Sequence, residues 1–120
     1  MITAIQNLPE GVVGFSAEGT VTDADYRKVL IPAVEDALRS GRRLRFLYVL
    51  GPGFAGYGAG AMLDDTLFGV KHYFDFEKIA CVTDNLTYGT MVRSFGFLIP
   101  AEVRVFAADE LDAAKAWLAA

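Results

Sequence analysis

LRFLYVL, residues Leu44–Leu50, is a nearly unbroken apolar run of strand length, and GPGFAGYGAG, residues Gly51–Gly60, follows it directly. Such a run is typical of a strand that is covered on both faces at the centre of a parallel sheet. The five glycines of the second segment predict a loop, because glycine populates positive φ about as readily as negative φ. Ligands of open α/β sheets bind outside the carboxyl ends of the strands, so this loop is the first candidate site.

The composition limits both the number of domains and the class of partner. A length of 120 residues fits a single domain over residues 1–120, and 53% hydrophobic residues can fill its core. The net charge of −4 argues against nucleic acid or an anionic membrane as a partner. Cys81 is the only cysteine and His72 the only histidine, so we expect no disulfide, no metal site and no cofactor.

The N-terminal segment Met1–Gln6 lacks the basic region and the long apolar core of a signal peptide. No segment approaches the ~20 apolar residues that a membrane-spanning helix needs. We therefore expect a cytoplasmic protein without a membrane span.

Hydrophobic periodicity and turn residues predict the element order β-β-α-β-α-β-α-β-α. The expected strands are Ile2–Gln6, Val12–Gly19, Leu44–Leu50, Lys78–Thr83 and Ala101–Ala107. Repeated β-α units predict an α/β fold with a mostly parallel five-stranded sheet and right-handed crossovers. The tight link Asn7–Gly11 makes the N-terminal strand antiparallel to the second. Alternating polar and apolar residues place the last strand at a sheet edge.

The first helix has clear end signals. Thr22 and Asp25 are spaced as in a capping box, and Gly41 is expected at the end of the helix. Pro32 should bend this helix, because its missing N–H frees the carbonyl of Lys28. Asp84 or Asn85 can cap the third helix and Asp109 the last. Apolar stripes are expected at Tyr88, Met91, Val92 and Phe95 in the third helix and at Leu111, Ala114, Trp117 and Leu118 in the last.

The second helix, expected from about Ala61, carries the polar residues that could do chemistry. Its apolar stripe is expected at Leu63, Leu67, Val70 and Phe74. Asp65 and His72 are seven residues apart, so they share one side of the helix but lie about 10 Å apart along its axis. A carboxylate and an imidazole can perform acid–base work or bind a metal. No nucleophile is indicated between them, so we favour a solvated face for Asp64, Asp65 and His72 and predict no catalytic residue.

Short motifs carry a family resemblance across nearly the whole chain: Glu18-Gly19 followed by Asp25-Tyr26, Ile79–Asp84, Ala101–Phe106, and Ala113-Ala114 with Ala116–Leu118. Together with the order of elements, they resemble the SpoIIAA-like family of small bacterial domains. The resemblance implies the fold shared by STAS domains, the anti-sigma-factor-antagonist type, and by CRAL-TRIO lipid-binding domains. Antagonists of that type switch by phosphorylation of a serine at the start of a helix after a central strand. Gly51–Leu63 contains no serine or threonine, so the switch does not carry over, and Tyr88 stands where family members often have tryptophan.

The segment Gly51–Gly56 also matches the dinucleotide-binding pattern G-x-G-x-x-G. That motif needs a helix opening inside it and an acidic residue about 20 positions on. Here the helix is expected near Ala61, Pro52 removes a backbone donor, and Asp84 is too distant. A flexible or close-packed loop is the favoured interpretation, and the absence of a Lys-Ser or Lys-Thr pair excludes a P-loop.

Nine of the fifteen aromatic residues cluster between Phe54 and Phe97, which favours core packing but leaves an apolar pocket or a protein contact open. The candidate ligand or partner surface is Gly51, Phe54, Tyr57, Phe68, His72, Tyr88 and Phe95. We expect a non-enzymatic binding or regulatory module that forms a homodimer or contacts a protein partner. The alternative is a small carrier for an apolar or lipid-like ligand beside Gly51–Gly60, and a third hypothesis is an enzyme that uses Asp65 and His72.

Overall fold

The computed structural model describes residues 1–96 and 98–120, without the side chains of residues 62–64, 66, 70 and 95. Within these residues the sheet has five strands in the order β1-β2-β3-β4-β5. They are β1 (Ile2–Ala4), β2 (Val12–Val21), β3 (Leu44–Tyr57), β4 (Phe76–Val82) and β5 (Glu102–Phe106). β1 is antiparallel to β2, and the remaining neighbours pair in parallel. The predicted α/β fold is confirmed, with β3 at the centre and β5 at an edge.

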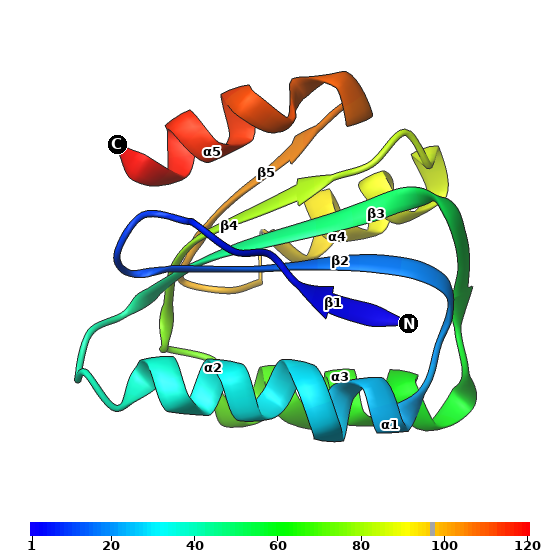
Figure 1. Cartoon of the computed structure of the whole chain (residues 1–120), viewed down its shortest axis with the longest axis horizontal. Coiled ribbons are helices and arrows are strands. Elements are labelled where there is room, and N and C mark those ends of the chain that lie inside the picture. The colour runs from blue at the N-terminus through cyan, green and yellow to red at the C-terminus, as the bar shows by residue number, and fades with distance from the viewer. Residues whose placement is uncertain (97) are drawn as a thin grey trace.

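The helices divide unequally between the two faces of the sheet. The described elements are α1 (Asp23–Asp25), a π turn η1 (Tyr26–Leu30), α2 (Ile31–Leu38), α3 (Ala59–Lys71), α4 (Leu86–Gly96), a 3₁₀ turn η2 (Ala108–Glu110) and α5 (Leu111–Ala119). Right-handed crossovers that step one strand at a time place each connecting helix on the same face. Figure 1 shows α1, α2 and α3 on one side of the sheet and α5 on the other.

Two apolar cores result from this arrangement. The larger one packs Phe15, Phe46 and Leu50 against Tyr26, Leu30 and Val34, and residues of α4 such as Val92 join it. The smaller one packs Leu47, Ala80 and Val82 against Ala114 and Leu118 of α5. Successive side chains of a strand point to opposite faces, so the apolar run of β3 fills both cores. The prediction that Leu44–Leu50 is covered on both faces is confirmed.

The prediction of a loop at Gly51–Gly60 is wrong for most of that segment. β3 continues to Tyr57, and its extension pairs with the end of β2 across two register shifts, with Val21 opposite Tyr57. The glycines allow close packing in this strand: a Cβ on Gly51 would lie 1.7 Å from Glu18 Oε1. The other carboxylate oxygen of Glu18 accepts from the backbone N–H of Gly53 at 3.1 Å.

The segment from Thr22 to Gly41 keeps its predicted end signals and adds a wide turn. Thr22 and Asp25 form the capping box, with Thr22 N donating to Asp25 Oδ2 at 2.8 Å. The irregularity expected from Pro32 lies directly before it, as the five-residue π turn, in which Ile31 N–H donates to the carbonyl of Tyr26. Gly41, at φ +79°, ends the segment two residues after the C-cap.

The end signals of the later helices are confirmed in part. Asn85 caps α4, since its Oδ1 accepts from Tyr88 N at 3.1 Å. Asp109 does not cap α5: the 3₁₀ turn precedes that helix, and Glu110 Oε1 accepts from Ala107 N at 2.7 Å.

The side of α3 that faces the sheet differs from the predicted one. Leu67 is 58% exposed, and Phe74 is 71% exposed and lies beyond the end of the helix. Leu63 and Val70, the other members of the predicted stripe, lie outside the described side chains. The side chains that face inward are instead Ala61 and His72, both buried, with Phe68 half-buried between them. The solvated face expected for His72 is therefore wrong.

Candidate functional site

The main cavity lies between α3 and the sheet and has a volume of about 410 Å³. Its walls are mainly apolar and come from the π turn, β3, α3, β4 and the segment before β5: Leu30, Phe46, Phe68, Phe76, Ile79 and Ile99. Tyr48, Asp65, His72 and Tyr73 supply its polar groups. A predominantly apolar cavity of this size with a few converging polar groups has the general character of a small-molecule site.

His72 is buried at the C-cap of α3 and keeps one nitrogen without a partner. Its Nδ1 lies 2.7 Å from Asp75 Oδ2. An ionised carboxylate only accepts hydrogen bonds, so Nδ1–H donates the hydrogen bond to Asp75. Nε2 is buried and has no hydrogen-bond partner among the described residues. The ring packs against Phe68, with centroids 4.8 Å apart.

Asp65 lies two turns before His72 on the same side of α3. Its Oδ1 accepts a hydrogen bond of 2.7 Å from the hydroxyl of Tyr26, a fully buried residue of the π turn. Desolvation raises the pKa of the Asp65 carboxyl, and the hydrogen bond from Tyr26 opposes part of that rise. No cationic side chain among the described residues forms an ion pair with Asp65.

Tyr48 places a second unpartnered polar atom beside the cavity. Its hydroxyl is buried and completes no hydrogen bond within the described part of the chain. Burial raises the pKa of Tyr48, and the nearby hydroxyls of Tyr57 and Tyr26 oppose part of that rise, although neither meets the geometry of a hydrogen bond to Tyr48 Oη. Buried polar atoms almost always have partners, so two exceptions on residues that line one cavity make it the candidate site.

The predicted surface residues fall into two groups. Phe68 and His72 line the cavity. Phe54, Tyr57 and Tyr88 form a separate half-buried triangle with ring centroids 5.0 to 6.0 Å apart, which packs against the larger core. Gly51 lies against Glu18, away from both groups. The side chain of Phe95 lies outside the described residues.

Sequence reasoning missed Phe46 and Tyr48 as cavity residues and set Asp65 aside as solvated. One signal was available. Ala61, Asp65, Phe68 and His72 follow helical spacing, so a stripe with two polar members shares one face of α3. Tyr48 is likewise the one hydroxyl within the apolar run of β3.

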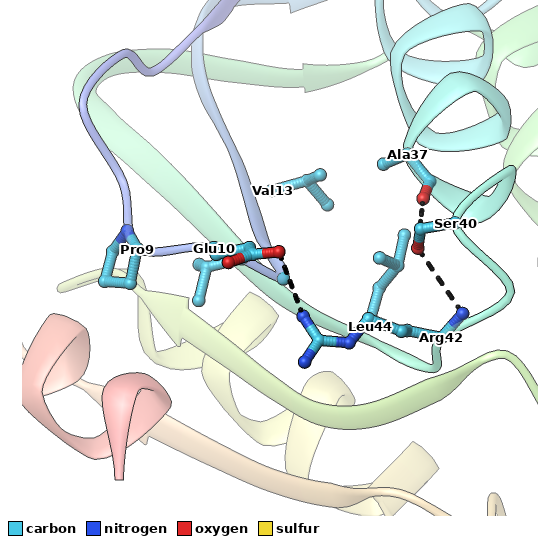
Figure 2. Close-up of a pocket in the computed structure, with 9 residues that line it drawn as sticks. Pro9, Glu10, Val13, Ala37, Ser40, Arg42 and Leu44 are labelled. Carbon is cyan, nitrogen blue, oxygen red and sulfur yellow. Dashed lines mark hydrogen bonds and ion pairs between the residues drawn. The ribbon is translucent and has the colours of Figure 1, made fainter.

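A second cavity of about 270 Å³ lies between the start of β2 and the end of α2 (Figure 2). Its polar groups satisfy one another. Arg42 pairs with Glu10 at 3.4 Å, and Ser40 Oγ donates to the carbonyl of Ala37 and accepts from Arg42 N. This cavity therefore lacks the unpartnered atoms that distinguish the main one.

Other chemistry has little support among the described residues. They contain no group of three histidine, cysteine, aspartate or glutamate side chains placed to hold a metal ion. No helix in the described part of the chain is both long and apolar enough to cross a bilayer. Burial raises the pKa of the Cys81 thiol to about 11, which keeps it protonated at neutral pH.

Comparisons with known proteins concern the fold. A family model described as SpoIIAA-like matches residues 12–119. No curated protein is similar enough to count as a match. Among solved structures, an uncharacterised protein with a SpoIIAA-like fold from Shewanella loihica PV-4 superposes with a TM-score of 0.77 at 23% identity. The match covers 98% of this chain and 92% of that one, and at this identity the likeness shows the fold alone.

Proposed function

The chain belongs to the SpoIIAA-like family, and from this premise we propose that it is a non-enzymatic binding module for a small, mainly apolar ligand. The ligand lies in the main cavity between α3 and the sheet. The sequence placed the ligand of a carrier beside Gly51–Gly60, whereas no described residue of that segment lines this cavity.

The observation that carries the proposal is the pair of buried, unpartnered atoms, Tyr48 Oη and His72 Nε2, on residues that line one apolar cavity. Leaving a buried polar atom without a partner costs about 1–3 kcal/mol. A bound molecule with a hydrogen-bonding group can supply the missing partner. Phenylalanine or leucine at either position would leave no unpartnered polar atom beside the cavity.

The same geometry supports binding over catalysis. Asp65 and His72 lie on one side of α3 but about 10 Å apart along its axis, so they do not act on one atom. His72 has Asp75 as its carboxylate partner, but the described lining contains no serine or cysteine for that pair to activate.

A neutral fluorescent reporter tests the proposal. N-phenyl-1-naphthylamine should bind the wild-type chain with 1:1 stoichiometry and increase in fluorescence. Gly69→Leu should abolish this binding, because Gly69 lines the cavity and a Cβ built there meets nothing within 4 Å. The control is Ala113→Leu, which adds the same side chain at an exposed position of α5 across the sheet. Equal reporter binding by wild type and Gly69→Leu would refute the proposal.

The expected homodimer or protein partner and the cytoplasmic location stay predictions. Large apolar side chains do reach the surface on α3, just after it, at the start of α4 and after α4, namely Leu67, Phe74, Leu86 and Leu98. Light scattering at micromolar concentration tests the dimer, and a monomer at all concentrations would contradict it.

A further inference from the structure

The cavity has a distinct charge character. Among its described lining residues Asp65 is the only aspartate or glutamate, and there is no lysine or arginine. His72 is the basic side chain among these lining residues, and its Nδ1–H already points to Asp75. An anionic ligand such as a fatty acid would therefore meet a carboxylate and no cation.

The carboxylate of Asp65 is oriented for a ligand. Asp65 keeps accessible surface, yet desolvation raises its pKa. Asp65 is an exposed residue that also lines the cavity, so one side of its carboxylate is close to protein atoms and the other side is open. Only Oδ1 is engaged, by the hydroxyl of Tyr26, and no described cation balances the charge. The open side of the carboxylate is therefore available to a cation in the cavity.

The wall opposite α3 suits the same charge. The rings of Tyr48, Phe46 and Phe76 form a series on this wall, with neighbouring centroids 5.8 and 5.5 Å apart, and Phe68 of α3 faces it with its centroid 6.2 Å from that of Phe76. Aromatic faces attract cations electrostatically, and they attract them more strongly when the cation is desolvated. The same rings offer apolar area to an alkyl or aryl body.

We propose that the ligand is an organic cation: an amine with an apolar body, whose ammonium group pairs with Asp65 and whose body packs against the Phe46–Phe76 wall. This inference rests on the proposed function and names the ligand class of the same cavity. Two lining residues, Asp65 and Tyr48, carry oxygens that can accept the N–H donors of an ammonium group.

Three matched probes test the charge preference: 4-phenylbutylamine, 4-phenylbutan-1-ol and 4-phenylbutanoate. Their dissociation constants are measured by calorimetry at pH 8, where an ordinary imidazole is neutral, and at 0.15 M salt, which screens surface charge. We expect the amine to bind at least about tenfold more tightly than the alcohol, and the carboxylate more weakly still. Asp65→Asn, whose amide oxygen can still accept from Tyr26, should weaken amine binding by about tenfold or more.

Asp112→Asn is the control, because it removes the same charge from an exposed position on α5. It should leave amine binding unchanged. Equal or tighter binding of the alcohol or the carboxylate would overturn the inference, as would full amine affinity in Asp65→Asn. If the neutral reporter binds but the amine is not preferred, the inference fails and the proposed function stands. If neither the reporter nor any probe binds, both fail.

Discussion

Removing one hydroxyl from each of two neighbouring tyrosines should change stability in opposite directions. Tyr26 is fully buried, and its hydroxyl donates to the Asp65 carboxylate at 2.7 Å. The hydroxyl of Tyr48 is buried without a partner. Tyr26→Phe and Tyr48→Phe are the same chemical change in the same core, so their difference isolates the hydrogen bond.

The magnitudes follow from the contacts of each hydroxyl. A hydrogen bond to a charged group contributes about 1.5–3 kcal/mol, and Tyr26→Phe loses it and leaves Asp65 Oδ1 without a donor. We expect Tyr26→Phe to lower the free energy of unfolding by about 2 kcal/mol. An unpartnered buried hydroxyl costs about 1–3 kcal/mol, so Tyr48→Phe should raise that free energy by about 1 kcal/mol.

Urea denaturation followed by circular dichroism measures both variants. The midpoints should move in opposite directions at an unchanged m-value, and the thermal midpoints should differ by roughly 10 °C, at a few degrees per kcal/mol for a domain of this size. A Tyr48→Phe variant that is destabilised as much as Tyr26→Phe would refute the reasoning. It would mean that the Tyr48 hydroxyl has a partner in solution, and the cavity would lose one of its two unpartnered atoms.

Four further outcomes follow from the same structure. Gly69→Ala should raise the free energy of unfolding by about 0.5–1 kcal/mol in urea titrations, because its new Cβ meets nothing and alanine favours the helix; a loss of stability would contradict the open space at that position. Gly51→Ala should lower it by about 1 kcal/mol, since the carboxylate of Glu18 must move and gives up its bond to Gly53 N–H, and this loss should shrink in a Glu18→Ala background. Desolvation raises the folded-state pKa of Asp65, so the native state binds the proton more tightly than the unfolded chain and loses stability as the pH rises. The free energy of unfolding of Asp65→Asn, relative to that of wild type, should therefore be higher at pH 7 than at pH 4. A difference in urea midpoint between the two proteins that does not change with pH would argue against a desolvated carboxylate. Native Cys81, with its pKa raised to about 11, should react with a thiol reagent at pH 8 only as fast as the chain unfolds, and rapid stoichiometric labelling would show an accessible thiol.

The sheet could be predicted because its signals are local and redundant. The apolar run of Leu44–Leu50 has to be covered on both faces, and each β-α unit that follows restricts the next strand to a parallel neighbour. The capping box at Thr22 and the cap at Asn85 depend on residues within one turn, and both formed as expected.

The extension of β3 could not be read from Gly51–Gly60, because glycine and proline content predicts a loop whenever the partner strand is unknown. The backbone of β2 continues to Val21 and supplies that partner. Tertiary pairing then overrides local preference.

The inward side of α3 was missed for a different reason. Leucine and phenylalanine at positions 67 and 74 gave the stronger apolar period, and hydrophobic periodicity assigns the most apolar side to the core. The chain instead buries His72 and places Asp65, which stays exposed, beside the cavity. Such a conflict between local pattern and fold is expected where a binding site replaces part of a core.

The π turn at Tyr26–Leu30 sets which side chain meets Asp65. A π turn holds one more residue than an α turn, and each α-helical residue rotates the chain by about 100°. A homologue lacking one of residues 27–29 would form an uninterrupted α-helix here. Its tyrosine would then be rotated about the helix axis by about 100° and would no longer point to the carboxylate. In this chain the length of that turn is therefore as much a determinant of the cavity's chemistry as any residue that lines it.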